Sequence, residues 1–203
     1  MSRTLVIVRH GNTFAADEPP RRIGARTDLP LVPSGQDQAH RLGIWFAEQG
    51  WRFGRILCSP LRRTRETADI VRAAQTDPPP VEPSALLAEI DHGVDEDRPE
   101  RDVVARVGTD ALATWDKRGV APDGWTADRE ARIEGWRALF APRDDDTVLL
   151  VTSNGAARFA LLANPELAMQ ARQLPTLKLR TGAFGIIRVA DNGLQLAAWD
   201  QRP

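Results

Sequence analysis

The chain has 203 residues, of which 42% are hydrophobic and 27% charged, and its formal net charge is −1 at pH 7. This length suffices for one sizeable core. The small net charge gives no global field that would favour a nucleic acid or an acidic membrane. Cys58 is the only cysteine, which excludes an intrachain disulfide, and no apolar stretch approaches the ~20 residues of a membrane span. We therefore expect a cytoplasmic protein without nucleic-acid or membrane partners; the number of subunits does not follow from the sequence.

The most informative stretch lies near the N-terminus. Four consecutive apolar residues at positions 5–8 run directly into Arg9, His10 and Gly11. Such a run predicts a strand buried on both faces, and Gly11 permits a turn after it. His10 would then lie at the carboxyl end of a central strand, where open α/β sheets bind ligands, and Arg9 beside it favours an anion. The alternative is a strand-end histidine that only bonds a neighbouring carbonyl.

Two helices and a second strand follow. Ser34 is a good N-cap, and the apolar spacing after it predicts a helix that Gly50 ends. Residues 55–58 predict a second short strand, and Ser59 with Pro60 predicts a helix start directly after it. Basic residues gather at this junction, where the free amides and the dipole of a helix favour anions.

The middle of the chain is predicted to be helical. Residues 81–83 read as a short edge strand or an extended link. From Pro99 to about Phe140 the pattern is helical, and its tryptophans are expected to pack in a core rather than form a ligand platform. The acidic residues 144–146 predict an exposed turn and lack the ligand pattern of a calcium loop.

The last third alternates strands with helices. Residues 147–152 predict a buried strand, followed by a turn and a helix that ends near Asn164. Residues 184–189 and 194–199 predict a hairpin joined at Asp191-Asn192-Gly193. The alternation along the whole chain predicts a single α/β domain.

Three motifs resemble one known family. Arg-His-Gly-Asn-Thr at positions 9–13 closely resembles the active-site signature of the histidine phosphatase superfamily, the phosphoglycerate-mutase-like proteins. Ser-Pro-Leu-Arg-Arg at 59–63 resembles the family's Ser-Pro-Leu-x-Arg, with Arg63 in the place of the phosphate-binding arginine; Arg62 and Arg65 are interpreted as solvated. The stretch around 87–93 is similar to the segment that supplies the general acid, which would be Glu89. Its chemistry alone would indicate an ordinary surface glutamate.

The resemblance implies a fold and a chemistry. The expected fold is a three-layer α/β/α sandwich with a mostly parallel central sheet and helices on both faces, forming one domain over 1–203 with a helical cap-like insertion around 85–145. The implied reaction is phosphoryl transfer through a phosphohistidine on His10, from a small phosphate ester or a phosphoprotein. Arg9, Asn12 and Arg63 would bind phosphate, with Ser153 and Asn154 as further phosphate-binding candidates. Glu89 would move the proton, and no cofactor or metal is expected.

One position departs from the family pattern. Where most members have a second histidine, this chain has Ser153, with Asn154 as a substitute that could reach inward, while Gly155 and Arg158 keep their places. Two functions stay open as a result: a metal-independent phosphatase, or a weak or inactive relative that binds phosphorylated ligands as a sensor or partner. A mutase is least favoured, because the stretch that begins at Glu89 lacks the Glu-Arg-His-Tyr-Gly motif of the mutases.

Overall fold

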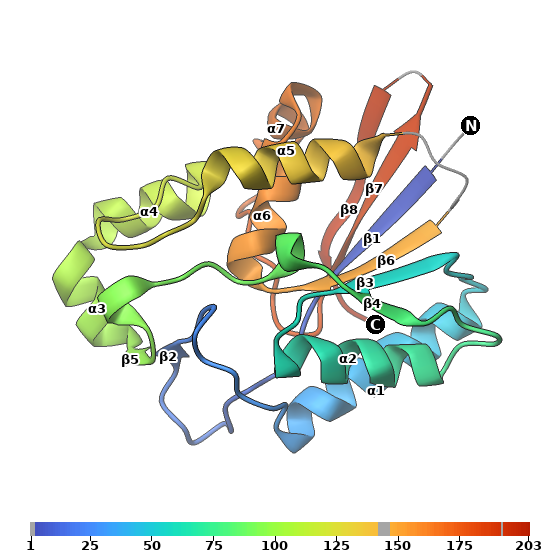
Figure 1. Cartoon of the computed structure of the whole chain (residues 1–203), viewed down its shortest axis with the longest axis horizontal. Coiled ribbons are helices and arrows are strands. Elements are labelled where there is room, and N and C mark those ends of the chain that lie inside the picture. Colours follow the sequence, from blue (N-terminus) through green and yellow to red (C-terminus); the bar gives the residue numbers. More distant parts are fainter. Residues whose placement is uncertain (1–2, 142–146, 192) are drawn as a thin grey trace.

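Six strands form the central sheet, in the order β4-β3-β6-β1-β7-β8 (Figure 1). The computed structural model describes residues 3–141, 147–191 and 193–203; the predicted acidic turn at 144–146 and Asn192 of the hairpin turn lie outside them. The strands are β1 (Arg3–Arg9), β3 (Arg55–Cys58), β4 (Val81–Pro83), β6 (Thr147–Thr152), β7 (Phe184–Ala190) and β8 (Gly193–Gln201). The first four are mutually parallel, and β7 and β8 form an antiparallel hairpin at one edge, which confirms the predicted mostly parallel sheet.

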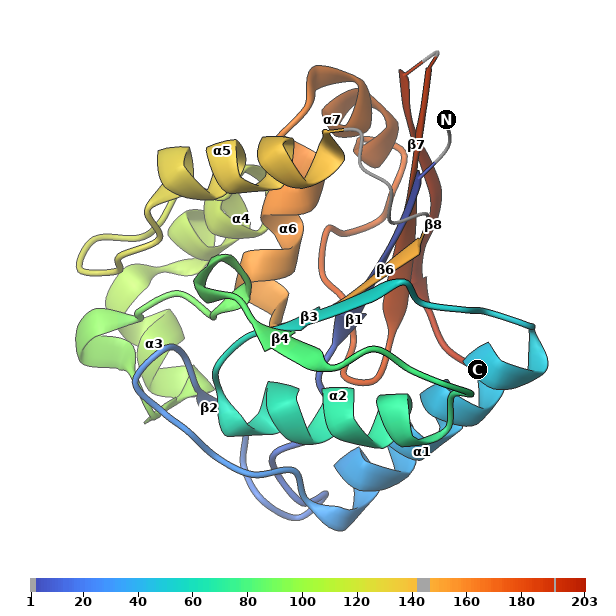
Figure 2. The same cartoon turned by 45° about the vertical axis from the view of Figure 1, so that its right-hand side comes forward.

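Helices cover both faces of the sheet (Figures 1 and 2). They are α1 (Pro33–Glu48), α2 (Arg62–Ala73), α3 (Glu100–Val107), α4 (Thr109–Arg118), α5 (Arg129–Phe140), α6 (Asn154–Leu162) and α7 (Pro165–Ala171). In both views α1 and α2 lie on one face, and α5, α6 and α7 lie on the other. This arrangement confirms the three-layer sandwich.

The β1 strand contributes side chains to two hydrophobic cores, one on each face of the sheet, as its continuous apolar run predicts. Val6 and Val8 pack with residues of α1 and α2 on one face of the sheet. Leu5 and Ile7 point to the opposite face and pack with residues of α4 to α7. Because successive side chains of a strand point to opposite faces, only a strand apolar at every position can be buried between two helical layers.

The segment between β4 and β6 is mainly helical. It contains the short 3₁₀ turns η1 (Ala85–Leu87) and η2 (Gly93–Asp95), then β5 (Arg98–Pro99), α3, α4 and α5. The predicted helical stretch is thus three helices, and α3 passes into α4 at Gly108, whose φ of +80° suits glycine. Trp115, Trp125 and Trp136 are buried, as expected for core side chains. The β5 strand pairs with β2 (Arg21–Arg22), which ties this segment to the loop after β1.

Two helix starts differ from the sequence prediction. The α1 helix begins at Pro33, whose lack of an N–H suits the first helical position, so Ser34 is not its cap. The Ser34 hydroxyl instead accepts a hydrogen bond from Asn12 Nδ2 at 3.2 Å. The α2 helix begins at Arg62 rather than beside Pro60, because Ser59 Oγ accepts from the Leu61 amide at 3.3 Å and holds a turn ahead of the helix. Arg63 therefore lies in the first turn of α2.

No helix within the described ranges is both long enough and apolar enough to cross a bilayer.

Candidate active site

Three parallel strands end side by side at one edge of the sheet, and each delivers part of the site. Arg9 at the end of β1 is in register with Thr152 at the end of β6. The His10 amide then donates to the Thr152 carbonyl at 3.0 Å, and the Ser59 amide after β3 donates to Val151 at 3.0 Å. The segments after β1, β3 and β6, far apart in sequence, therefore begin next to one another.

His10 is a buried histidine in its neutral form. Its side chain is 3% exposed, and its Nδ1 lies 2.7 Å from the Gly11 carbonyl oxygen. A carbonyl can only accept, so Nδ1 carries the proton and Nε2 keeps its lone pair. Burial lowers the pKa of His10 well below its usual range, and the charges of Arg63 and Arg9 lower it further. His10 therefore makes the hydrogen bond to a neighbouring carbonyl, and this bond leaves Nε2 available as a nucleophile.

Two buried guanidinium groups flank this histidine. Arg63 is fully buried; its Nη1 donates to the Thr27 carbonyl at 2.6 Å and its Nη2 to that of Gly24 at 3.0 Å. Arg9 donates from Nη1 to the Leu179 carbonyl at 2.7 Å. The Nε atoms of both arginines are buried without a hydrogen-bond partner among the described residues. Burial lowers the pKa of Arg9 to about 10, so both groups stay charged at neutral pH and retain N–H groups for an anion.

Glu89 lies at the N-terminus of α6. Its carboxylate accepts hydrogen bonds from the amides of Ile90 and Gly155, both at 2.9 Å. A Cβ on Gly155 would lie 2.1 Å from Glu89 Oε1, so only glycine admits the carboxylate here. Burial alone would raise the pKa of Glu89, but the nearby His92, the two amides and Arg63 together lower it. The carboxyl group is therefore ionised at neutral pH, and burial does not supply the protonated form that a general acid needs.

The structure places Ser153 and Asn154 differently from each other. Ser153 is 1% exposed, and its Oγ is buried without a partner in the described part of the chain. Asn154 lines the cleft described below, and its Oδ1 accepts from the Leu179 amide at 2.9 Å. At the N-terminus of α6, the Gly155 amide already donates to the carboxylate of Glu89.

Asn12 is tied at both ends of its amide group. Its Nδ2 bonds Ser34, and its Oδ1 accepts from the Thr181 hydroxyl. The backbone amide of Asn12 donates to Gln38 Oε1 at 2.9 Å. Asn12 therefore joins α1 to the loop before β7, and one Nδ2 hydrogen remains for a ligand.

These residues surround a cleft of about 350 Å³. Of the residues predicted from the sequence, Arg9, His10, Asn12, Glu89 and Asn154 line it, whereas Arg63 and Ser153 are buried and are not among its lining residues. Its further lining includes the cations Arg21, Arg22, Arg158 and Lys178 and the acids Glu100 and Asp116. Within the described ranges, no three His, Cys, Asp or Glu side chains are grouped as a metal site would require.

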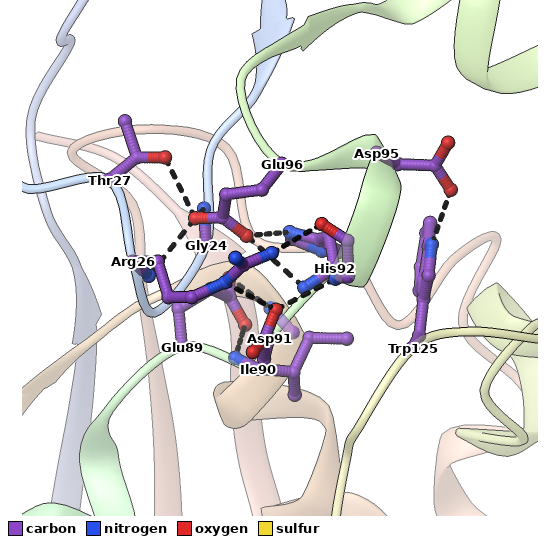
Figure 3. Close-up of polar contacts among 12 residues, drawn as sticks. Gly24, Arg26, Thr27, Glu89, Ile90, Asp91, His92, Asp95, Glu96 and Trp125 are labelled. Atoms are coloured by element: carbon purple, nitrogen blue, oxygen red, sulfur yellow. Dashed lines mark hydrogen bonds and ion pairs between the residues drawn. The ribbon is translucent and has the colours of Figure 1, made fainter.

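Sequence reasoning missed Glu96, which organises the loop that holds Arg63 (Figure 3). Its Oε1 accepts from the Gly24 amide at 2.8 Å, the Arg26 amide at 3.1 Å and the Thr27 hydroxyl at 2.8 Å. Its Oε2 accepts from the His92 amide at 3.1 Å. Burial alone would raise the pKa of Glu96, but these hydrogen bonds lower it to about 2. The carbonyls that receive the Arg63 guanidinium belong to this same loop.

His92 both lines the cleft and packs against an aromatic side chain. Its ring meets Trp125 edge to face at a centroid distance of 4.5 Å. Its Nδ1 lies 3.5 Å from Glu96 Oε2. His92 thus belongs to the Glu96 network (Figure 3), and its charge also helps to lower the pKa of Glu89.

The sequence pattern of the histidine phosphatase superfamily (branch 1) matches residues 5–202. The chain belongs to the histidine phosphatase superfamily. A relative, a broad-specificity phosphatase of Saccharomyces cerevisiae, is 31% identical over 67 residues. That match covers 33% of this chain and 28% of the yeast protein, so the chain spans only a small part of that relative.

Solved structures share the histidine phosphatase fold over nearly the whole chain. The Bacillus stearothermophilus protein YhfR has a TM-score of 0.78 at 24% identity, with 99% of this chain and 98% of that chain covered. A mycobacterial glucosyl-3-phosphoglycerate phosphatase has a TM-score of 0.73 at 21% identity, with 98% and 99% covered. The α-ribazole phosphatase of Shigella flexneri has a TM-score of 0.72 at 24% identity, with 98% and 96% covered. At these identities the likeness establishes the fold.

Proposed function

We propose that this protein is a metal-independent phosphatase that hydrolyses a phosphomonoester through a phosphohistidine on His10. The observation that carries the proposal is the neutral, buried His10, whose Nδ1 is tied to Gly11 while Arg9 and Arg63 supply positive charge around it. A phosphate ester repels nucleophiles by its charge, and guanidinium forks match its oxygens. The superfamily assignment supports a phosphatase, and these arginines supply the positive charge that a metal ion provides elsewhere.

The proposed reaction has two steps. In the first, the Nε2 lone pair of His10 attacks phosphorus, the bond to the leaving oxygen breaks, and that oxygen takes a proton from Glu89. In the second, water attacks the phosphohistidine, Glu89 removes a proton from the water, and the P–N bond breaks to release inorganic phosphate. Because Glu89 is ionised in the free protein, its proton must arrive with the substrate, whose negative charge raises the pKa of a neighbouring carboxyl group.

The test uses p-nitrophenyl phosphate as a generic substrate, with EDTA present. We expect phosphate release above the buffer rate, inhibition by vanadate, and a labelled protein intermediate that is labile in acid and stable in base. Release at the buffer rate would leave the second candidate, a protein that binds phosphorylated ligands without turnover. That candidate is favoured by Ser153, which leaves no imidazole at the position where most family members have their second histidine.

We also propose that the helical segment around 85–145 acts as a cap within a single domain. Trp115 of α4 and Glu100 of α3 line the same cleft as His10, so this segment supplies one wall of the site. Paired strands β2 and β5 hold it against the loop after β1.

Glu89→Gln is expected to separate the two kinds of leaving group. We compare kcat/KM, which reports the steps up to phosphohistidine formation and not the later hydrolysis that both substrates share. For alkyl phosphates, whose leaving oxygen needs a proton, we expect kcat/KM to fall by about 10²- to 10⁴-fold. For p-nitrophenyl phosphate, whose leaving group departs without a proton, we expect a much smaller loss. Glutamine keeps a carbonyl acceptor for the Gly155 amide, so the α6 terminus stays capped. An equal loss on both substrates would assign Glu89 to structure rather than to proton transfer.

Glu96→Gln is expected to affect stability and phosphate binding together. The pKa of Glu96 is lowered to about 2, so its ionised form stabilises the fold above the pKa of the unfolded chain, and this stability is lost as pH falls from about 4.5 to about 2. We expect Glu96→Gln to lower the unfolding free energy at pH 7 by roughly 2–3 kcal/mol. Urea titrations at pH 7 and at pH 3 measure this, and the difference between variant and wild type should shrink at pH 3.

The same variant tests whether Glu96 positions Arg63. If it does, KM for p-nitrophenyl phosphate rises in Glu96→Gln even at temperatures where the variant is fully folded. An unchanged KM would show that Glu96 stabilises the fold without positioning Arg63 for phosphate.

A further inference from the structure

A second and larger hollow, of about 890 Å³, shares two wall residues with the cleft. We call it the α4–α7 groove, because it is lined by the C-terminal end of α4, the end of α6, α7 and residues 174–178. The shared residues are Asp116 and Lys178, whose carboxylate and ammonium lie 2.7 Å apart. A single ion pair therefore stands at the boundary between the two hollows.

This boundary is anchored to the cleft. Asp116 also lies 3.4 Å from Nη1 of Arg158, a cleft residue that is 1% exposed. The Arg158 guanidinium stacks over Trp115 at 4.2 Å and donates to its carbonyl at 2.6 Å. The groove is thus continuous with the wall of the cleft rather than a separate surface feature.

The lining of the groove combines an apolar floor with a cationic rim. The floor is aliphatic and is made by Leu162, Ala168, Ala171, Leu174 and Leu177. The rim carries Lys117, Arg118, Arg129, Arg172 and Lys178, against the single acid Asp116, which is already paired. The other four cations form no ion pair with any residue in the described ranges. The chain has only two lysines among its 27 Lys and Arg residues, and both are here.

We propose that the α4–α7 groove binds the organic part of the substrate, and that this part is an elongated apolar body ending in a negative charge. The inference rests on the proposed function, since the phosphate of the same molecule would lie at His10. The volume falls within the ~300–1,000 Å³ typical of small-molecule sites. An aliphatic floor rewards buried methylene groups, and an excess of unpaired cations selects a terminal carboxylate or similar anion over a neutral end.

Two series of phosphate monoesters test this directly. One series is butyl, octyl and dodecyl phosphate, and the other carries a carboxylate at the far end of each chain. We expect kcat/KM to rise by about threefold for each methylene that enters the groove. The carboxylate should add about fivefold for the chain that reaches the rim, mainly through KM. Equal kcat/KM for the carboxylate and methyl ends at every length would overturn the proposal.

Matched variants locate the effect. Lys117 and Arg172 are exposed and do not line the cleft, so K117Q with R172Q should remove the carboxylate preference and leave p-nitrophenyl phosphate turnover unchanged. R188Q, which removes an exposed charge from β7, is the control and should keep the preference. A preference that survives in the double variant would also overturn the proposal.

Binding measurements separate this inference from the proposed function. If no ester is hydrolysed, the proposed phosphatase fails, and the phosphonate analogues then test the groove by calorimetry. The carboxylate-ended dodecyl phosphonate should bind more tightly than its methyl-ended counterpart, and the double variant should abolish the difference. Binding of a phosphate-free dicarboxylate that does not compete with the phosphonate would instead mark a separate effector site and contradict a shared substrate.

Discussion

His10→Ala is expected to reduce turnover of p-nitrophenyl phosphate by about 10⁴-fold or more, to near the buffer rate. The imidazole of His10 is neutral and keeps a lone pair on Nε2, whereas the second imidazole of the cleft, His92, faces Glu96 and Trp125. Initial rates of phosphate release measure the effect. Phosphohistidine trapping should fail in the same variant.

A second histidine provides the matched control for this prediction. His40 is exposed on α1, so His40→Ala should leave both the rate and the trapped intermediate unchanged. Circular dichroism establishes that both variants are folded. Comparable rates in wild type and His10→Ala would contradict the phosphohistidine mechanism.

The pH profile gives an independent measure of the His10 environment. The pKa of His10 is lowered by burial and by Arg63 and Arg9, so the neutral nucleophile persists below the usual value of about 6.5. The same shift makes the fold lose stability as pH falls below that value, because the unfolded chain binds the proton more readily. We expect kcat/KM to show no step near 6.5 that is due to this group.

Arg63→Met is expected to lower kcat/KM by about 10³-fold. The Arg63 guanidinium is fully buried beside His10 and held by the carbonyls of Gly24 and Thr27, so methionine removes its charge and keeps most of its apolar volume. The loss should appear in both kcat and KM, because the charge meets the phosphate in the ground state and in the transition state.

Arg65 offers a control in the same helix. It is exposed on α2, so Arg65→Met removes an equal charge without touching the site and should change kcat/KM by less than about twofold. The two carbonyls left without a donor will also destabilise Arg63→Met, and rates are therefore compared at a temperature where urea titration shows both variants to be folded. A kcat/KM loss in Arg63→Met no larger than in Arg65→Met would remove Arg63 from the phosphate site.

The sequence by itself determined the central strand, the layers and the family. The apolar run before Arg9 predicts a strand buried on both faces, and the alternation of strands with helices predicts the mostly parallel sheet. These features depend on neighbouring residues, whose preferences are readable along the chain. The family could be recognised for the same reason, because its sequence motifs around His10 and Arg63 are contiguous. The match to the superfamily over residues 5–202 confirms this assignment.

Helix starts were less predictable, because a capping residue can find another partner. Ser34 has a side chain suited to capping a helix. Its hydroxyl instead accepts a hydrogen bond from Asn12, which lies in another segment, and the helix begins at Pro33. Local propensity ranks such alternatives by small energies, and a tertiary contact of about 1 kcal/mol reverses the order.

Only the tertiary structure decided how the site is held together. The carboxylate of Glu89 occupies the α6 terminus at Gly155, 66 positions away, and Glu96 holds Gly24 at a separation of 72. The Asp116–Lys178 pair that divides the cleft from the groove likewise joins two remote segments. Hydrogen bonds and ion pairs of this kind depend on distance in space, which the layering of helices on the sheet sets and which no local pattern of residues records.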